Sequence, residues 1–408
     1  MSQDTLSLGF TGVGGRGAEL LETMLHFDDI AIDVICDSQE HHLEAATEAI
    51  SANNRPDPRR YYDHAAMVSK ENLDAVVIAT PWRMHIPMAI TAMEHDVDVG
   101  LEVGPASTVQ ECWDLVETAR ETGSRCMLLE NCCYGRRELG ILQMVRADEF
   151  GEIIHAECGY CHDLRERLVT GRRPSDEAGA SRGFIGNHYE KRNGDLYPTH
   201  GIGPIATLLD INRGNRFRSL TSTASKARGL DDWSKKNSGP DHSPSRSGWT
   251  SGDVIKTTIT CANGETVTVT HNVTLPRPYS RKYQLQGTDG LWQADGDLIH
   301  IEGKSPDHEW ESFTEDYQSE WDHPLWQEYR EAGVRGGHGG HDYLVLRDFI
   351  RGLAQDGPLP IDVYDTAVWM AISPLSEQSI EAGNDAVSVP DFTNGEWMTR
   401  EPSFDPQW

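Results

Sequence analysis

The sequence predicts an α/β protein that begins with a doubly wound parallel sheet and continues as an α+β domain with a largely antiparallel, open sheet. Three observations support this fold class. An apolar strand near the N-terminus runs into a glycine-rich turn. Apolar strands then alternate with amphipathic helices up to about residue 132. After about residue 150 the strands become shorter, alternate apolar with polar residues and are separated by turn dipeptides.

The glycine-rich turn lies in LSLGFTGVGGRGAELLETML, between strand 6–11 and an amphipathic helix. Glycines here make the turn tight and let the backbone approach a pyrophosphate at the helix N-terminus. The next strand, IAIDVICD, ends at Asp37, twenty residues after Gly17. A carboxylate at this place bonds to ribose hydroxyls and repels a 2′-phosphate, which favours NAD over NADP. We therefore expect a Rossmann domain whose cofactor contacts include Gly12, Gly14, Gly15, Arg16, Gly17 and Asp37.

Further polar side chains follow the later predicted strands. Thr80, Trp82 and His85 stand in an expected loop after one strand, Glu102 ends the next, and Asn131 ends the last. Ligands bind at the carboxyl ends of parallel strands, so these residues are candidates to contact cofactor or substrate. Ordinary structural roles stay open, with Trp82 in the core, His85 capping a helix and Glu102 in solvent.

Residues 1–132 are expected to form the NAD-binding domain. Residues 133–408 are expected to form a substrate-binding domain whose C-terminal helices pack back toward it. In the second domain, KTTITCANGETVTVTHNV predicts a hairpin turned at Asn263-Gly264. The polar segment 226–252 is expected to be a long surface loop.

The stretch GDLYPTHGIGP, residues 194–204, is also expected to be a loop, because glycine and proline are costly inside helices and strands. A stiff loop that carries Tyr197 and His200 is typical of a functional site.

Charge and composition exclude several classes of protein. The chain has 36 Lys and Arg against 65 Asp and Glu, a formal charge of −29. Such an acidic chain does not suit nucleic acid or an anionic membrane, since both require clustered positive charge. The sequence contains no apolar run of about 18 residues, and its start lacks a secretory signal, so we expect a cytoplasmic protein.

Two motifs could suggest a metal, but neither is expected to hold one. Cys158 and Cys161 form a single CxxC on a predicted strand, where residues three apart point to opposite faces. His338 and His341 have HxxH spacing, but glycines surround them and no third ligand is nearby. We interpret GGHGGHDY as a loop in which His338 contacts substrate.

Seven motifs in order carry a resemblance to a known family: TGVGGRG, TPWRMH, ASTVQECW, LENCCYGR, KRNGDLYPTHGIGP, RPYSR and GGHGGHDY. The chain resembles glycoside hydrolase family 109, the NAD-dependent α-N-acetylgalactosaminidases, within the glucose-fructose oxidoreductase and inositol dehydrogenase superfamily. The resemblance extends from the glycine motif to the last predicted helix. It implies a small-molecule glycoside substrate and, by analogy, a homo-oligomer.

The resemblance also assigns residues. NAD contacts fall on residues 14–17, Asp37, residues 82–85, Glu102, Val103 and Asn131. Substrate contacts fall on Tyr160, Tyr197, Pro198, Thr199, His200 and Tyr279. The implied reaction is oxidation at sugar C3, elimination across C1–C2, addition of water and re-reduction. His200 is the candidate for the O3 proton, and Tyr197 and Tyr160 are the candidate catalytic phenols.

The chain departs from relatives at two places. Relatives usually have Pro where this chain has Gly104. Val103 is not a departure: most dehydrogenases of the superfamily have Lys there, whereas the glycosidase branch has Val. Residues 184–187 also differ, so an expected Arg is missing unless Arg182 replaces it. Two alternatives therefore stay open: a sugar or polyol dehydrogenase that releases NADH, and a non-catalytic protein that binds NAD or sugar.

Overall fold

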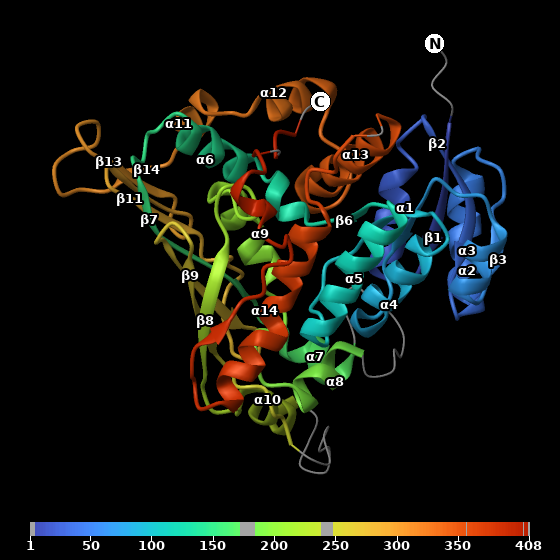
Figure 1. Cartoon of the computed structure of the whole chain (residues 1–408), viewed down its shortest axis with the longest axis horizontal. Coiled ribbons are helices and arrows are strands. Elements are labelled where there is room, and N and C mark those ends of the chain that lie inside the picture. Colours follow the sequence, from blue (N-terminus) through green and yellow to red (C-terminus); the bar gives the residue numbers. More distant parts are fainter. Residues whose placement is uncertain (1–4, 172–183, 238–247, 356, 403, 407–408) are drawn as a thin grey trace. The chain divides into compact units, whose positions relative to one another are not determined.

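The computed structural model describes residues 5–171, 184–237, 248–355, 357–402 and 404–406. They form two compact units, each made from separate stretches of the chain (Figure 1). Unit 1 lies within Met1–Leu139, Asp322–Ala367 and Ser403–Trp408. Unit 2 lies within Gly140–Trp321 and Val368–Pro402.

Unit 1 is built on a parallel sheet with strand order β3-β2-β1-β4-β5-β6 in the described residues, the Rossmann arrangement that the sequence predicted. Strand β4 is buried along its whole length and β5 at all residues after Asp98, as is typical of a parallel sheet covered on both faces. The strands are β1 Leu6–Thr11, β2 Ile30–Cys36, β3 Arg59–Tyr61, β4 Ala75–Ile78, β5 Asp98–Leu101 and β6 Cys126–Leu128.

The helical segments of unit 1 are α1 Arg16–Met24, α2 Glu40–Ala52, α3 His64–Lys70, α4 Trp82–Met93, α5 Val109–Thr122, η1 Asn131–Tyr134, α12 Pro324–Ala332, η2 His338–Gly340 and α13 His341–Ala354. Helix α13 packs against α1 and η1, although more than 200 residues separate it from them in sequence. The predicted division at residues 132 and 133 thus differs from the two units, because α13 shares a core with the N-terminal sheet.

Unit 2 contains a largely antiparallel open sheet, as predicted. In the described residues its order is β14-β13-β12-β11-β7-β10-β9-β8-β15, and β7 and β10 are its parallel neighbours. The hairpin between β9 and β10 turns at Asn263-Gly264, where Gly264 has φ 109°. The strands are β7 Ile153–Cys161, β8 Phe217–Ala224, β9 Ile255–Cys261, β10 Thr266–Asn272, β11 Gln284–Gly287, β12 Gly290–Gln293, β13 Leu298–Ile301, β14 Glu311–Ser312 and β15 Val387–Ser388.

Helices cover one face of this sheet. Strand β9 alternates buried and exposed residues, which is the pattern of a sheet with one face packed and one face in water. Helix α9 packs on β7, and α14 lies along β8, where Ser222 N–H donates to Ser379 Oγ at 2.8 Å (Figure 1). The helices of unit 2 are α7 Arg165–Thr170, α8 Phe184–Lys191, α9 Thr199–Leu208, α10 Gly229–Asn237, α11 Glu315–Glu320 and η3 Glu396–Met398. Helices α6 Arg136–Arg146 and α14 Val363–Glu381 include residues of both units.

The predicted loop at residues 194–204 is wrong in its second half, because α9 begins at Thr199 and contains Pro204. Tertiary packing outweighs the local preference. At Gly201 the helix approaches β7 so closely that a Cβ would meet Gly159 N at 2.7 Å. Pro204 has no N–H for the carbonyl of His200, and that carbonyl accepts the hydroxyl of Tyr283 instead.

Two other predicted loops also contain helix. Trp82 and His85 lie in the first turn of α4 rather than in a loop. Helix α10 occupies part of the polar segment 226–252, and residues 238–247 of that segment lie outside the described residues. Arg182 lies outside them as well. The last turn of α10 contains Lys235 and Lys236, whose positive charges interact favourably with the negative end of the helix dipole. This indication of a helix was overlooked because the segment was interpreted from its polar composition alone.

Candidate functional site

The glycine turn of unit 1 has the geometry of a dinucleotide cradle. Gly12 has φ 83°, and a Cβ on Gly17 would meet Gly12 O at 1.8 Å. Gly15, with φ 45°, precedes the first residue of α1. Among the described residues no side chain caps the start of α1 by a hydrogen bond, which suits anion binding at this helix N-terminus. The residues present fit a bound NAD pyrophosphate.

Asp37, the acid at the end of β2, is fixed against this turn. Its Oδ2 accepts the N–H of Val13 at 3.0 Å, and its Oδ1 lies 3.2 Å from His42 Nδ1. The imidazole of His42 also packs on Gly14, where a Cβ would meet the ring at 2.4 Å. Sequence reasoning did not identify His42, whose signal was its place in the first turn of α2.

The residues after β4 are tightly packed. His85 is fully buried and its Nε2 donates to the carbonyl of Thr80 at 2.7 Å, while burial lowers the pKa of His85 to about 4. The imidazole is therefore neutral at pH 7. Trp82 is also buried, and a Cβ on Gly104 would meet its indole at 2.7 Å. Val103, which directly precedes Gly104, is buried and supplies no titratable group.

A carboxylate that the sequence analysis missed joins three predicted site residues. Asp342 is fully buried and accepts two hydrogen bonds from Arg16, at 2.7 and 2.8 Å. It also accepts from Asn131 Nδ2 at 2.7 Å, and His338 Nδ1 lies 2.8 Å from it. The guanidinium of Arg16 further contacts Glu102 at 3.3 Å. Arg16, Asn131 and His338 thus meet around one buried carboxylate, and Glu102 is linked to it through Arg16.

This arrangement shifts the pKa of both Asp342 and Arg16. Burial alone would raise the pKa of Asp342, but hydrogen bonds and charge from Arg16 and His338 hold it well below its usual range. Burial alone would lower the pKa of Arg16, but the carboxylates of Glu102 and Asp342 raise it above its usual range. The pair is therefore ionised throughout the physiological pH range and fixes the start of α1 to the start of α13.

The predicted substrate residues of unit 2 form an aromatic cluster. The Tyr160 ring lies 4.6 Å from that of Tyr197, 5.5 Å from that of His200 and 6.1 Å from that of Tyr279, measured between centroids. The rings of Tyr197 and His200 are 4.9 Å apart and almost perpendicular. Four residues from three sequence regions therefore lie close together in unit 2.

The cluster has one buried side and one accessible side. Tyr160, Tyr197 and His200 are half-buried, and Tyr279 is 48% exposed. Pro198 and Thr199 are buried, so Tyr197 and His200 are the accessible members of that run.

A further residue, His162, extends the cluster and escaped the sequence analysis. Its ring lies 5.2 Å from that of Tyr279, and burial lowers its pKa. The signal for it was its place next to the end of β7, two residues after Tyr160. Arg281 Nε donates to the hydroxyl of Tyr279 at 2.9 Å and so orients that phenol.

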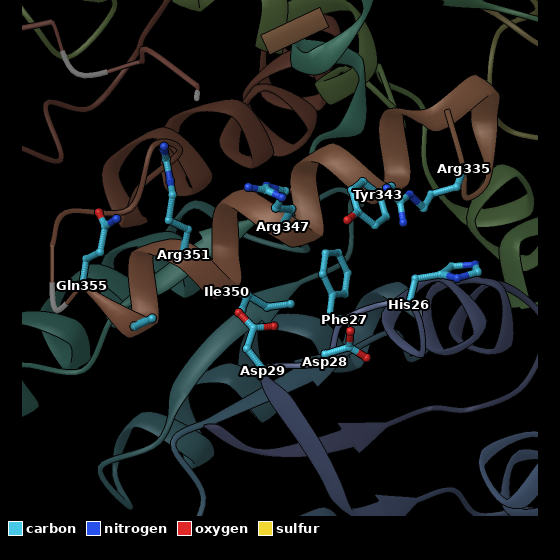
Figure 2. A pocket seen from close by; sticks show the side chains of 11 residues that line it. His26, Phe27, Asp28, Asp29, Arg335, Tyr343, Arg347, Ile350, Arg351 and Gln355 are labelled. Carbon is cyan, nitrogen blue, oxygen red and sulfur yellow. The ribbon is translucent and has the colours of Figure 1, made fainter. Parts of the chain in front are cut away.

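A separate hollow of about 370 Å³ lies elsewhere in unit 1 (Figure 2). One wall is α13, with Tyr343, Arg347 and Arg351, and the other includes residues 26–29 before β2. It is next to the amino end of β2, whereas Asp37 follows the carboxyl end. None of the predicted site residues lines it.

Among the described helices, none combines the length and apolar character that a bilayer span needs.

Comparison with solved structures confirms the fold. The chain superposes on levoglucosan dehydrogenase in complex with NADH and L-sorbose with a TM-score of 0.69 and 17% identity, covering 95% of this chain and 100% of the other. It superposes on an inositol dehydrogenase homologue from Azotobacter vinelandii, complexed with NAD⁺, with a TM-score of 0.65 and 15% identity, covering 94% and 97%.

Comparison with curated proteins and family models is more specific. The α-N-acetylgalactosaminidase of Tannerella forsythia is 43% identical over 419 residues, covering 99% of this chain and 89% of the relative. A glycosyl hydrolase family 109 protein of Parabacteroides distasonis is 42% identical over 416 residues, covering 98% and 89%. Residues 6–129 match the oxidoreductase family with an NAD-binding Rossmann fold, and residues 134–399 match the C-terminal domain of glycosyl hydrolase 109. The chain is an NAD-dependent enzyme that belongs to glycosyl hydrolase family 109.

Proposed function

We propose that the protein hydrolyses α-N-acetylgalactosaminides by transient oxidation of the sugar at C3. The observation that carries the proposal is the aromatic cluster, in which Tyr160, Tyr197, His200 and Tyr279 present an imidazole and three phenols on one accessible surface. The name of the relative from Tannerella forsythia supports the choice of sugar.

A bound NAD would supply the hydride acceptor for oxidation at C3 and the hydride donor for the final reduction, so that no net cofactor would be consumed. Residues of unit 1 would hold it. The turn at Gly12, Gly14, Gly15 and Gly17 would accept the pyrophosphate, and Asp37 would accept the ribose hydroxyls. Contacts from Thr80, Trp82, His85, Glu102, Val103 and Asn131 are part of the proposal.

Arg16 and His338 have a less direct role in this scheme. Both are bonded to the buried Asp342, so their polar groups are already engaged within unit 1. Arg16 would fix the shape of the turn, and His338, which is more exposed, would retain surface for the sugar. Val103 stands where a dehydrogenase would carry its proton-transferring Lys, which supports a glycosidase over a dehydrogenase.

His200 would remove the proton from O3 as C3 is oxidised, since imidazole titrates near neutral pH. Its accessible position in the first turn of α9 allows this contact. The phenols of Tyr160, Tyr197 and Tyr279 would move the C2 proton, protonate the leaving oxygen and bind sugar hydroxyls. Their proximity lets them act on adjacent sugar atoms, because C1, C2 and C3 are neighbours in one ring.

The test uses purified protein and p-nitrophenyl α-N-acetylgalactosaminide in deuterated water. We expect release of nitrophenolate, deuterium at C2 of the product and no net NADH. Steady NADH build-up with free sugars would identify a dehydrogenase instead. Failure to act on this or any other nitrophenyl glycoside, with NAD still bound, would identify a binding protein.

His200→Ala is the diagnostic variant. We expect loss of turnover by at least ~100-fold, the lower range for removing a general base, with NAD still bound. His300→Ala is the matched control, because His300 lies on β13 and bonds to the carbonyl of Glu309. Full activity in His200→Ala would contradict the role assigned to His200.

We also propose a cytoplasmic location and a homo-oligomer. All eight cysteines are buried as thiols, the state that a reducing compartment maintains. Light scattering of the eluting protein would measure the mass of the oligomer, and a mass of 45.5 kDa would indicate a monomer.

A further inference from the structure

Three buried polar side chains lie in a row next to the aromatic cluster of unit 2. Asp195 and His271 are each 1% exposed, and Asp195 Oδ1 is 3.6 Å from His271 Nδ1. On the other side of the ring, His271 Nε2 is 2.9 Å from the hydroxyl of Tyr189, which is also buried. None of these three side chains has a place in the reaction proposed above.

The interior position of Asp195 and His271 requires an explanation. Asp195 Oδ2 and His271 Nδ1 have no hydrogen-bond partner among the described residues. A buried, unsatisfied polar atom is destabilising, and native proteins keep few of them. Burial raises the pKa of Asp195 to about 7, and burial lowers the pKa of His271 to about 3. Near neutral pH, His271 is therefore neutral, and the protonated form of Asp195 competes with its carboxylate form.

Asp195 is connected directly to the predicted catalytic residues. Its Oδ1 accepts the backbone N–H of Tyr197 at 3.2 Å. Its own backbone is fixed to α14, since its N–H donates to Ser376 Oγ at 2.8 Å and its carbonyl accepts the hydroxyl of Ser373. Asp195 thus links helix α14, which holds its backbone, to Tyr197, whose N–H its carboxylate accepts.

His271 is connected to the other side of the cluster. It is paired in register with Tyr160 on the neighbouring parallel strands β10 and β7. Its ring is nearly parallel to that of Tyr160, at 6.5 Å between centroids and 22° between planes. It shares the inward phase of β10 with Val267 and Val269, so a polar ring occupies a position where the strand otherwise buries valine.

We propose that Asp195 and His271 are a buried pair of positioning residues, which together set the placement of Tyr197 and Tyr160 for the reaction. The inference rests on the proposed function, because it assumes that these tyrosines act on the sugar. The pair acts through its neighbours: Asp195 holds the backbone of Tyr197, and His271 supports the ring of Tyr160. Neither reaches substrate, since both are buried.

The experiment compares Asp195→Ala with Asp195→Asn. Asparagine keeps an oxygen for the N–H of Tyr197 and adds an N–H₂ donor for His271 Nδ1, whereas alanine provides neither. We expect Asp195→Ala to lower kcat ~10- to 100-fold, the effect of misplacing a reacting group by about 1 Å, with KM changed less than about 3-fold. We expect Asp195→Asn to retain kcat within about 5-fold.

Three further measurements separate positioning from general damage. Asp253→Asn is the matched control, because Asp253 is a buried carboxylate of unit 2 that bonds to the backbone of Gly229 and the hydroxyl of Thr274. The thermal midpoint of Asp195→Ala should not fall with its kcat, since that variant also removes the buried Oδ2, which has no hydrogen-bond partner among the described residues. 3-Fluorotyrosine at position 197 reports the surroundings of that ring by ¹⁹F NMR without any need for activity.

The outcomes distinguish this inference from the proposed function. A shifted ¹⁹F resonance and a low kcat in Asp195→Ala, both restored in Asp195→Asn, would support the positioning pair. Wild-type kcat and an unshifted resonance in Asp195→Ala would overturn it. An inactive wild type would overturn the proposed function, and the ¹⁹F comparison would still decide whether Asp195 positions Tyr197. If Asp195→Ala does not fold, His271→Gln takes its place, and wild-type kcat in that variant would overturn the pair.

Discussion

Asp342 is the residue on which the predicted site of unit 1 depends. Its buried carboxylate accepts hydrogen bonds from Arg16 and Asn131, and His338 lies beside it. We expect Asp342→Asn to lower the free energy of unfolding by ~3 kcal/mol, because removing one partner of a buried pair leaves the other charge without compensation. Urea unfolding would measure this loss, and Asp232→Asn, at an exposed pair with Lys236, should change it little.

The pKa of Asp342 also predicts a dependence on pH. This pKa is lower in the folded protein than in the unfolded chain, where it is about 3.9. The stabilisation that ionised Asp342 provides is therefore fully present at pH values above its unfolded pKa. It is lost as the pH falls below that pKa toward the folded pKa. Unfolding free energies measured between pH 7 and pH 3 should fall less steeply for Asp342→Asn than for the wild type. Parallel curves would contradict this assignment.

Gly104 lies at a tightly packed place, and the structure gives a reason for a small residue here. A Cβ on Gly104 would lie 2.7 Å from the indole of Trp82, which is buried and has little room to move. We expect Gly104→Ala to cost ~1–3 kcal/mol, the range for overpacking a core, and to weaken retention of NAD. Chemical denaturation and the NAD content of the purified variant would measure the two effects. Gly357→Ala is the control, because a Cβ there meets no atom within 4 Å.

At the scale of elements, the close approach of α9 to β7 decides where His200 lies. Gly201 faces Gly159, and a Cβ on Gly201 would be 2.7 Å from the backbone N of Gly159. Backbone cannot move aside as a side chain can, so we expect Gly201→Ala to displace α9. The variant should lose at least ~10-fold in kcat, while NAD, held by unit 1, stays bound. Turnover and NAD content would be measured together, again with Gly357→Ala as control. Wild-type kcat would show that α9 tolerates the displacement.

At the scale of the whole molecule, the charge of −29 should make stability sensitive to salt. Like charges repel in the compact state, and salt screens them, with a Debye length of about 30 Å at 0.01 M and 10 Å at 0.1 M. We expect the thermal midpoint to rise as KCl is increased from 0.01 to 0.5 M. Differential scanning calorimetry would measure it, with an equal osmolality of sucrose as control. A midpoint independent of KCl would show that the charges are already well separated or paired.

The sequence by itself determined the fold class, and it predicted site residues whose roles stay predictions. The glycines at 12, 14, 15 and 17 identify the dinucleotide-binding turn directly, because few residues other than glycine fit a tight turn before a helix. The Asn263-Gly264 turn identified its hairpin for the same reason, since the turn type demands those residues. The residues Tyr160, Tyr197, His200 and Tyr279 were named from motifs, and they lie together in unit 2.

Only the tertiary structure decided how those residues are held. Local propensity made residues 194–204 a loop, but the Gly201–Gly159 contact and the Tyr283 hydroxyl stabilise a helix there. Asp342, Asp195 and His271 were not identified from sequence, because each derives its importance from partners far along the chain. A buried charge or ring depends on long-range packing and the desolvation that comes with it, and local sequence patterns contain neither.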